Sequence, residues 1–303
     1  MSAQLIDGRK IQQDILERVA RSLQDSLVVP TVALVMVEGD DPMAGVNFRL
    51  HQKVLTGAGL LVKPVVLPVG TGQAGLLERI GQLNADVDID AVMTLMPLPP
   101  HLDIREVLAA IDPDKEVEGL HPAHAARLSP LSAQPPVRVP IVPLSVLTML
   151  ASVGFNPSEA HVVTLVDPEL MESNPVAKFV ARVGAFANLP AGAIGSVVPY
   201  THPWAKEACR TADLLIVSVT KPGLVKADWV KGGATVIDFN AICVSTEPTV
   251  RLVGGVDVES VSAVAGALCP IPGGIGPVML GVLAQQIAQV AADRAAAREP
   301  AFQ

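Results

Sequence analysis

Apolar residues recur along the first half of the chain in two alternating patterns, one typical of helices and one typical of buried strands. Residues 11–27 place Ile11, Ile15 and Val19 at the spacing of one helical face. Residues 31–37 form a continuous β-favouring apolar run, which predicts a strand buried on both faces. A helix is predicted next, with Asp41 as its N-cap and Pro42 as its first residue. The same alternation then predicts a strand at 62–69, a helix at 75–84, a strand at 91–95 and a helix at 104–111.

The alternation restarts in the second half, after a stretch with little periodicity. Residues 129–143 contain five prolines and are the best candidate for a domain boundary. Beyond them we expect helices at 143–153, 175–183 and 278–298, and strands at 161–166, 196–199, 214–219 and 235–239. Strands separated by helices indicate parallel βαβ units, so we predict an α/β fold with two βα domains. In such folds ligands bind at the carboxyl ends of the strands.

Composition limits the classes of function. The net charge of −8 gives no support for binding to nucleic acid or to an anionic membrane, which needs clustered Lys and Arg. The three cysteines are widely spaced and predict neither a disulfide framework nor a zinc site. The chain shows no signal-peptide pattern and no uninterrupted run of about 18 apolar residues. We therefore expect a soluble cytoplasmic protein that does not bind a membrane.

A segment near the C-terminus, residues 269–279, combines three prolines with three glycines. Proline fixes φ and removes a donor, whereas glycine permits backbone conformations and close approaches that other residues do not. Because good helix formers follow, we predict a rigid loop at the start of a helix, where free N–H groups can meet a ligand. From this segment alone, a tight turn before a terminal helix explains the pattern equally well.

Several motifs extend, in matching order and spacing, over nearly the whole chain. They are residues 5–8, 97–99, 112–122, 212–217, 221–223, 236–238 and 270–277. With these motifs the chain resembles the bifunctional methylenetetrahydrofolate dehydrogenase/methenyltetrahydrofolate cyclohydrolase family. The resemblance implies a folate-binding catalytic domain at 1–140 and 272–303, with the C-terminal helix packing back on it. It also implies a Rossmann-like NAD(P)-binding domain at 141–271, which dimerises.

The resemblance further implies where a folate binds. The family's substrate helix carries a Tyr and, four residues later, the acid/base Lys, and these positions are Asn47 and His51 here. The Gln that positions this Lys falls on Leu95, and the Asp that binds the pterin edge falls on Glu118. One wall of the folate site is expected from Pro272, Gly273, Gly274, Gly276, Pro277 and Met279.

These replacements differ in their chemical consequences. Glu118 keeps a carboxylate that can pair with the donor edge of a pterin, whereas Asn47 has no aromatic face to stack on it. His51 has an ordinary pKa of about 6.5, suited to proton transfer near neutral pH, but Leu95 cannot orient it. His51 and Glu118 are therefore the candidate catalytic residues. The alternative for His51 is a solvated helix residue with no role.

The nucleotide side departs further from the family. Its glycine-rich pyrophosphate turn falls on residues 167–174, which contain no glycine and three carboxylates. Acidic side chains at a helix start repel phosphate, although they can also cap the helix. The family's cofactor positions fall on Asp167, Pro168, Glu169, Thr220, Asn240 and Ala241. The family implies NADP, but this turn argues against NADP binding of the usual kind.

Three functions stay open. The first is a dehydrogenase and cyclohydrolase of tetrahydrofolate one-carbon metabolism. The second is a non-catalytic paralogue that either binds a folate or pairs with an active homologue. The third possibility is an altered enzyme that uses His51 and Glu118 on a related one-carbon or pterin compound without a nicotinamide. The replaced residues favour the second and third. A tetrahydrofolate derivative is the expected ligand and a homodimer the expected assembly, and no metal site is predicted.

Overall fold

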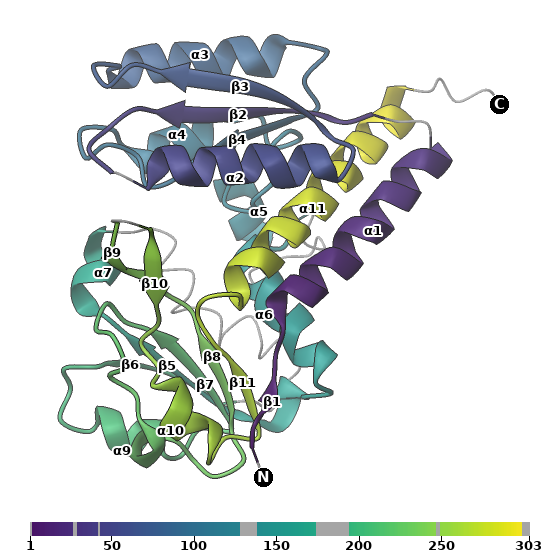
Figure 1. The fold of residues 1–303 in the computed structure, drawn as a ribbon. Helices are drawn as coiled ribbons and strands as arrows, with labels where there is room; N and C mark the ends of the chain where they lie inside the picture. The colour runs from purple at the N-terminus through teal and green to yellow at the C-terminus, as the bar shows by residue number, and fades with distance from the viewer. Residues whose placement is uncertain are drawn as a thin grey trace. The chain divides into compact units, whose positions relative to one another are not determined.

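The computed structural model describes residues 2–26, 29–41, 43–127, 138–173, 194–246 and 249–298. Its contacts divide the chain into two compact units (Figure 1). Residues 1–12 and 142–279 form one unit, here called the large-sheet unit, and residues 13–141 and 280–303 form the other, the small-sheet unit. The predicted domain bounds differ from these units at residues 1–12, 141 and 272–279, and they stay a prediction about functional domains.

Six parallel strands form the sheet of the large-sheet unit. Their order is β1 (Gln4–Leu5), β11 (Ala267–Cys269), β8 (Thr235–Asp238), β7 (Leu214–Ser218), β5 (His161–Val166) and β6 (Ile194–Pro199). Every residue of β7 and β8 is buried, as expected of strands covered on both faces. Because the strands run in one direction, the carboxyl ends of β5, β7 and β8 lie at one edge of the sheet.

Short elements complete the large-sheet unit. The helices are α6 (Ile141–Ser152), α7 (Pro168–Ser173), α9 (Ala205–Cys209) and α10 (Val258–Ser262), with 3-10 turns η1 (Pro157–Glu159) and η2 (Ala227–Trp229). Strands β9 (Ile242–Ser245) and β10 (Arg251–Val253) pair antiparallel. The sequence pattern missed α7, α9, α10, β1 and β9 to β11, because two to six residues show little periodicity. The predicted helix at 175–183 lies outside the described residues, as does most of the predicted boundary at 129–143.

The small-sheet unit contains three parallel strands in the order β3 (Leu61–Leu67), β2 (Thr31–Val37) and β4 (Ala91–Thr94). Alternate residues of β2 pack with α3 (Gln73–Ala85) and α4 (Ile104–Ala110) in one apolar core. Helix α2 (Ala44–Gly57) contacts β2 and β3 and buries Phe48 and Leu55. The remaining helices are α5 (Pro122–Arg127) and parts of α1 (Gly8–Ser26) and α11 (Ile275–Arg298).

Helix α11 starts at Ile275, three residues before the predicted start. Pro277 is therefore the third helical residue, and it fits there because the first turn has no internal acceptor for its missing N–H. From Leu280 onward the helix belongs to the small-sheet unit, where the Gln286 amide donates to the Val139 carbonyl at 3.0 Å. This confirms that the C-terminal helix packs back on the first domain. By length and composition the helix could cross a membrane, but 56% of that apolar window is buried inside the protein.

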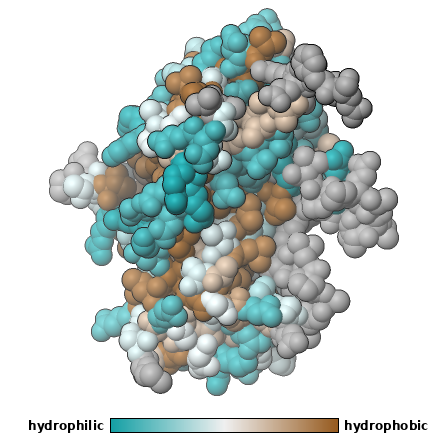
Figure 2. Space-filling view, turned by 90° about the vertical axis from the view of Figure 1, so that its right-hand side faces the viewer, coloured by the Kyte–Doolittle hydropathy of each residue, from teal (hydrophilic) through white to brown (hydrophobic). Residues whose placement is uncertain are grey.

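Helix α1 shows the amphipathic pattern that predicted it. Ile15 and Val19 are buried, whereas Arg18 and Arg21 are exposed. Figure 2 views the side of the molecule on which α1 lies, and hydrophilic residues cover much of that side. The start of α2 differs from its prediction. Asp41 does not cap the helix, because α2 begins at Ala44 and the Asp41 carboxylate accepts the Met43 N–H at 2.9 Å.

Lys115 is a fully buried cation that ties the C-terminal end of α3 to the segment following α4. Its Nζ donates to the carbonyls of Leu83 at 3.1 Å, Asn84 at 2.7 Å and Asp86 at 2.7 Å. The last carbonyls of a helix have no internal donors, so one ammonium with three N–H groups satisfies them together. Burial lowers the pKa of Lys115, and nearby carboxylates partly oppose that shift. This cap fixes the position of residues 115–118.

Lys115→Met should destabilise the protein by about 3 kcal/mol, because three buried carbonyls lose their donor. Lys63→Met is the matched control. Lys63 pairs with Asp86 at the surface, so its replacement should lower the free energy of unfolding far less. Urea unfolding of both variants measures the difference. Equal losses would show that Lys115 does not hold the end of α3.

Candidate functional site

Asn47 and His51 lie one helical turn apart on α2, as their spacing predicts. The His51 ring is half-buried, and its Nδ1 lies 2.7 Å from the Asn47 carbonyl oxygen. Since a carbonyl only accepts, Nδ1 carries the proton and Nε2 of the neutral ring keeps its lone pair. Burial lowers the pKa of His51 below its ordinary value, although the bond to Asn47 raises it. His51 is therefore a neutral base at pH 7, with Nε2 as its basic atom.

Glu118 lies at the carboxyl end of the small sheet. Residues 115–118 run beside β4, with Val92 and Glu116 in parallel register and the Val92 N–H bonded to the Lys115 carbonyl at 2.9 Å. Glu118 comes two residues after this isolated bridge, just as Thr94, the last residue of β4, comes two residues after Val92. Leu95 follows directly, and its N–H donates to the Val35 carbonyl at 2.7 Å. Leu95 and Glu118 thus each follow the Val92–Glu116 bridge by two or three residues.

The Glu118 carboxyl is only 7% exposed. Burial first, and the neighbouring negative charge of Glu116 second, raise the pKa of Glu118 to about 8. At pH 7 the group is mainly an uncharged acid, which the sequence did not indicate. Leu95 is also buried and offers no polar atom to His51 or Glu118. The small-sheet unit therefore holds a neutral base and a neutral acid near pH 7.

Two glycines of the proline-glycine segment do not accept larger residues, Gly273 because of its backbone conformation and Gly274 because of close packing. Gly273 has a φ of +95°, a conformation that favours glycine. A Cβ on Gly274 would lie 2.4 Å from the Pro270 carbonyl oxygen and 2.5 Å from the Cys269 sulfur. A Cβ on Gly8, the first residue of α1, would lie 1.8 Å from the Gly274 carbonyl oxygen. The start of α1 and this segment therefore hold each other in one conformation.

The rest of the segment differs in exposure. Pro272 and Gly276 are exposed and Met279 is half-buried. Nothing lies within 4 Å of a Cβ placed on Gly276, so this glycine is open to a ligand or to solvent. Cys269 is buried against Met149, and burial raises the pKa of its thiol to about 12, which excludes a thiolate nucleophile at neutral pH.

Asp167 and Thr220, two of the predicted cofactor residues, bond to each other at the edge of the large sheet. Asp167 follows β5 and is 3% exposed. One of its carboxylate oxygens accepts the Glu169 N–H at 3.1 Å, and the other accepts the Thr220 hydroxyl. Because Glu169 is the second residue of α7, the Asp167 carboxylate occupies the first turn of that helix. Pro168, the first helical residue, is half-buried.

Asn240 lies at the same edge, after β8. Its amide donates to the Ser218 hydroxyl at 3.2 Å and weakly to the Val219 carbonyl at 3.5 Å. The next residue, Ala241, is exposed. At or just after the carboxyl ends of β5, β7 and β8 thus lie Asp167, Ser218 and Asn240. Thr220 joins them through its bond to Asp167. Sequence reasoning missed Ser218, because a serine ending an apolar strand carries no signal of its own.

Asp238, the last residue of β8, was also missed as a site residue. Its carboxylate accepts the N–H groups of Gly255 at 3.1 Å and Val256 at 2.9 Å. Burial raises the pKa of Asp238 to about 6, although these two bonds oppose the shift. A Cβ on Gly254 would lie 1.8 Å from an Asp238 oxygen, so the loop after β10 closes directly on the carboxylate. Asp238 holds this loop in place.

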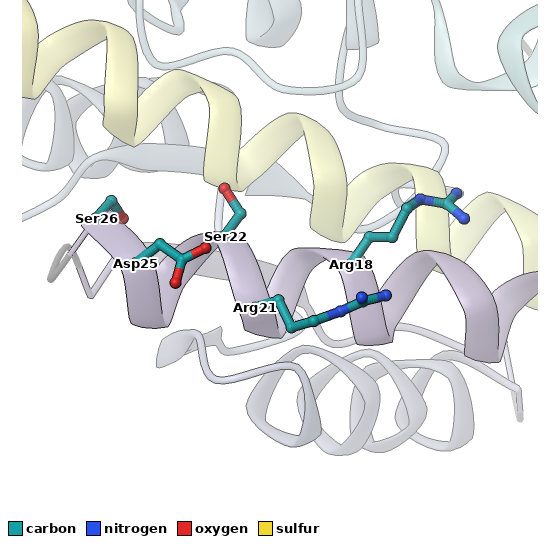
Figure 3. Close-up of a pocket in the computed structure, with 5 residues that line it drawn as sticks. All are labelled: Arg18, Arg21, Ser22, Asp25 and Ser26. Carbon is teal, nitrogen blue, oxygen red and sulfur yellow. The ribbon is translucent and has the colours of Figure 1, made fainter.

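A shallow depression lies on the exposed side of α1. It is lined by Arg18, Arg21, Ser22, Asp25 and Ser26. Figure 3 shows the Arg18 and Arg21 side chains extending in the same direction along the helix. All five lining residues are exposed, so this is a solvated helix face. None of the predicted site residues lines it.

The architecture defines a two-domain α/β protein with parallel sheets and polar side chains at their carboxyl edges. Residues 6–118 match the family model for the catalytic domain of tetrahydrofolate dehydrogenase/cyclohydrolase, and residues 140–295 match the model for its NAD(P)-binding domain. The chain belongs to the tetrahydrofolate dehydrogenase/cyclohydrolase family. This confirms the predicted family and fold class, a catalytic-type domain and a Rossmann-like domain.

Individual relatives support the same assignment. Proteins named bifunctional protein FolD from Rhodospirillum rubrum and Neisseria gonorrhoeae are 35% and 33% identical over 93% of this chain and 95% of theirs. The crystal structure of the Trypanosoma brucei methylenetetrahydrofolate dehydrogenase-cyclohydrolase, complexed with NADP and an inhibitor, matches with a TM-score of 0.83 and 26% identity. That match covers 99% of this chain and 100% of that one. The Campylobacter jejuni enzyme matches with a TM-score of 0.82 and 25% identity, over 97% and 100%.

Gly8→Ala should destabilise the protein by about 1–3 kcal/mol, because the new methyl group would overlap the Gly274 carbonyl. Gly81→Ala is the control, since Gly81 lies within α3 with nothing within 4 Å of its Cβ position. That change should stabilise the helix by up to about 1 kcal/mol. Thermal unfolding compares the two, and a neutral Gly8→Ala would refute the close approach.

Proposed function

We propose that this chain binds a tetrahydrofolate derivative and does not carry out the NADP-linked dehydrogenase step of its family. The observation that carries the proposal is the Asp167 carboxylate in the first turn of α7, with the Thr220 hydroxyl on its second oxygen. In a Rossmann-like domain, the pyrophosphate of a dinucleotide binds at the helix start that follows the first strand. Here a negative side chain fills that position.

The residues at this edge do not fit NADP for two physical reasons. A pyrophosphate beside a buried carboxylate meets like-charge repulsion in a medium that screens it poorly. The turn also has no glycine, so its side chains keep the backbone N–H groups away from a phosphate. The Trypanosoma brucei relative was crystallised with NADP, so the family fold itself accepts this cofactor. The difference lies in this chain's own residues.

The folate side of the proposal rests on Glu118 and the proline-glycine segment. Glu118 is a carboxyl group at the carboxyl edge of a parallel sheet, where ligands of such folds bind. Among the described residues, no hydrogen bond occupies its carboxyl oxygens. An unpartnered carboxyl of this kind can accept the paired N–H donors of a pterin once it is ionised. The segment 270–277 keeps the backbone features that the family resemblance assigns to a folate wall.

An altered acid/base enzyme is the second candidate, favoured by the opposite pKa shifts of His51 and Glu118. Hydrolysis of a methenyl group adds water to the carbon between two nitrogens, after which one C–N bond breaks and that nitrogen gains a proton. In this proposal His51 Nε2 takes the proton of the attacking water. Glu118 supplies the proton to the leaving nitrogen and takes the hydroxyl proton of the adduct as the formyl C=O forms, so the one proton released overall is the one on His51. No nicotinamide takes part. This is cyclohydrolase-type chemistry without the family's Lys.

Location and assembly belong to the same proposal. We place the protein in the cytoplasm as a homodimer, with pairing to an active homologue as the alternative. The absence of paired cysteines among the described residues fits a reducing compartment. Sedimentation of the purified chain, alone and mixed with an active relative, distinguishes the two assemblies.

Tetrahydrofolate should raise the melting temperature and NADP should not. A ligand at 100 times its Kd stabilises the folded state by about 2.7 kcal/mol, a shift of a few degrees for a chain of this size. The Trypanosoma brucei relative, which binds NADP in its crystal, is the positive control for the NADP arm. Stabilisation by NADP would contradict our interpretation of Asp167. If neither ligand raised the melting temperature, folate binding would be contradicted and a partner role favoured.

His51→Lys combined with Leu95→Gln should raise cyclohydrolase activity by about 100-fold or more, because the pair restores an acid/base Lys and its positioning amide. His101→Lys is the control, since His101 is an exposed histidine of the same unit. Absorbance of the methenyl compound follows the rate. No gain, with tetrahydrofolate shown to bind, would mean that more of the catalytic machinery is missing. His51→Ala in the parent tests the second candidate, because it should abolish any activity that depends on Nε2.

A further inference from the structure

One carboxylate holds both ends of the turn that carries Glu118. Oε1 of Glu116 accepts the Glu118 N–H at 2.6 Å, and Oε2 accepts the His121 N–H at 3.4 Å. Between them Gly119 has a φ of +73°, and a Cβ there would lie 2.6 Å from the Pro140 nitrogen. The turn therefore has one conformation, and Glu116 is the side chain that fixes it.

Glu116 is itself 1% exposed, and two cationic or ionisable side chains lie close to it. His124 Nε2 lies 3.6 Å from Oε2 of Glu116 and 3.0 Å from the Pro113 carbonyl. The Arg138 guanidinium donates to the same carbonyl at 3.0 Å and lies 3.5 Å from His124 Nε2. Both partners are also buried, His124 at 3% and Arg138 at 8% exposure. The cluster is a buried carboxylate, an imidazole and a guanidinium behind the Glu118 turn.

The charges around this cluster come from several elements. His121 and His124 face it from the start of α5, Arg138 from the segment before α6, and Asp293 from α11. Asp112 and Asp114 contribute from the loop after α4. Of all these groups, only the negative charge of Glu116 acts together with burial on Glu118. Glu116 also acts on Arg138, where its negative charge opposes the lowering of the pKa by burial.

We propose that Glu116 is a positioning residue: its carboxylate fixes the Glu118 turn and places a second buried acid within hydrogen-bond distance of the Glu118 backbone, which makes Glu118 a pH-dependent acceptor for the N–H donors of a ligand. The proposal rests on the folate-binding role of Glu118. It assigns a function to a buried carboxylate that otherwise looks only structural. It also makes ligand binding depend on pH. Glu118 is uncharged below about pH 8, so a ligand that prefers the carboxylate binds better as pH rises.

The first test measures Glu118 directly and needs no folate. Glutamate side chains labelled with ¹³C are titrated by NMR, and Glu118→Gln assigns the signal. The Glu118 midpoint should lie near 8 in the parent chain. In Glu116→Gln, which keeps an acceptor for the Glu118 N–H but removes the charge, it should fall by about one pH unit. Glu106→Gln, an exposed change in α4, should leave it unchanged.

The second test measures tetrahydrofolate affinity against pH. With a midpoint near 8, about one tenth of Glu118 is ionised at pH 7, so affinity should rise about 10-fold between pH 7 and pH 9. In Glu116→Gln this rise should move to lower pH by the same amount as the NMR midpoint. A purely structural role for Glu116 would weaken binding at every pH without moving the profile.

The outcomes separate the two proposals. An unchanged Glu118 midpoint in Glu116→Gln overturns the role of Glu116, whether or not folate binds. A shifted midpoint with no tetrahydrofolate binding at any pH supports Glu116 as the charge-setting group and overturns the proposed function. If Glu116→Gln does not fold, Glu116→Asp keeps the charge but moves it, and a smaller downward shift is expected. A parent midpoint below 6 overturns the inference without any variant.

Discussion

The burial of two adjacent charged side chains positions the candidate folate site. Lys115 and Glu116 both lie in the interior, although each would be costly there without partners. Lys115 satisfies three carbonyls at the end of α3, and Glu116 satisfies two N–H groups of the following turn. Because each partner is a backbone group, the segment cannot slide along β4 without leaving buried polar groups unpaired. Glu118 is therefore held at the sheet edge by its neighbours.

The two sheet edges show how burial sets the chemistry of a carboxyl group. Asp167 has a hydrogen-bond donor on each oxygen, the Glu169 N–H on one and the Thr220 hydroxyl on the other. Glu118 is buried beside a second carboxylate, without a hydrogen bond to its oxygens within the described residues, and its pKa rises to about 8. One acid is thus bound to the protein's own backbone and hydroxyl groups, whereas the other has no such partner within the described residues. The family fold is the same at both edges, and the difference comes from the side chains.

Much of the fold could be predicted from the sequence, because long apolar runs have one physical explanation. The strands at 31–37 and 161–166 match β2 and β5 residue for residue, and α1, α3, α4 and α6 lie within a few residues of their predicted ranges. The pattern failed where elements are short or end on polar residues. It missed α7, because an aspartate, a proline and two glutamates resemble a loop. It also predicted Asp41 as the N-cap of α2, whereas the N-cap is Met43 and the helix begins at Ala44.

For the candidate site as well, some features follow from the sequence and others only from the tertiary structure. The sequence by itself determined the family and the acidic composition of the turn at 167–174, because motif order and residue type are written in the chain. The site positions Asn47, His51, Leu95 and Glu118 stay a prediction from the same motifs. Only the tertiary structure decided that Asp167 bonds Thr220, that His51 presents Nε2 as its basic atom, and that Glu118 is uncharged at pH 7. Protonation states and hydrogen-bond partners depend on burial and on groups distant in the sequence. Glu116 and Arg138, 22 positions apart along the chain, face the same imidazole only after folding.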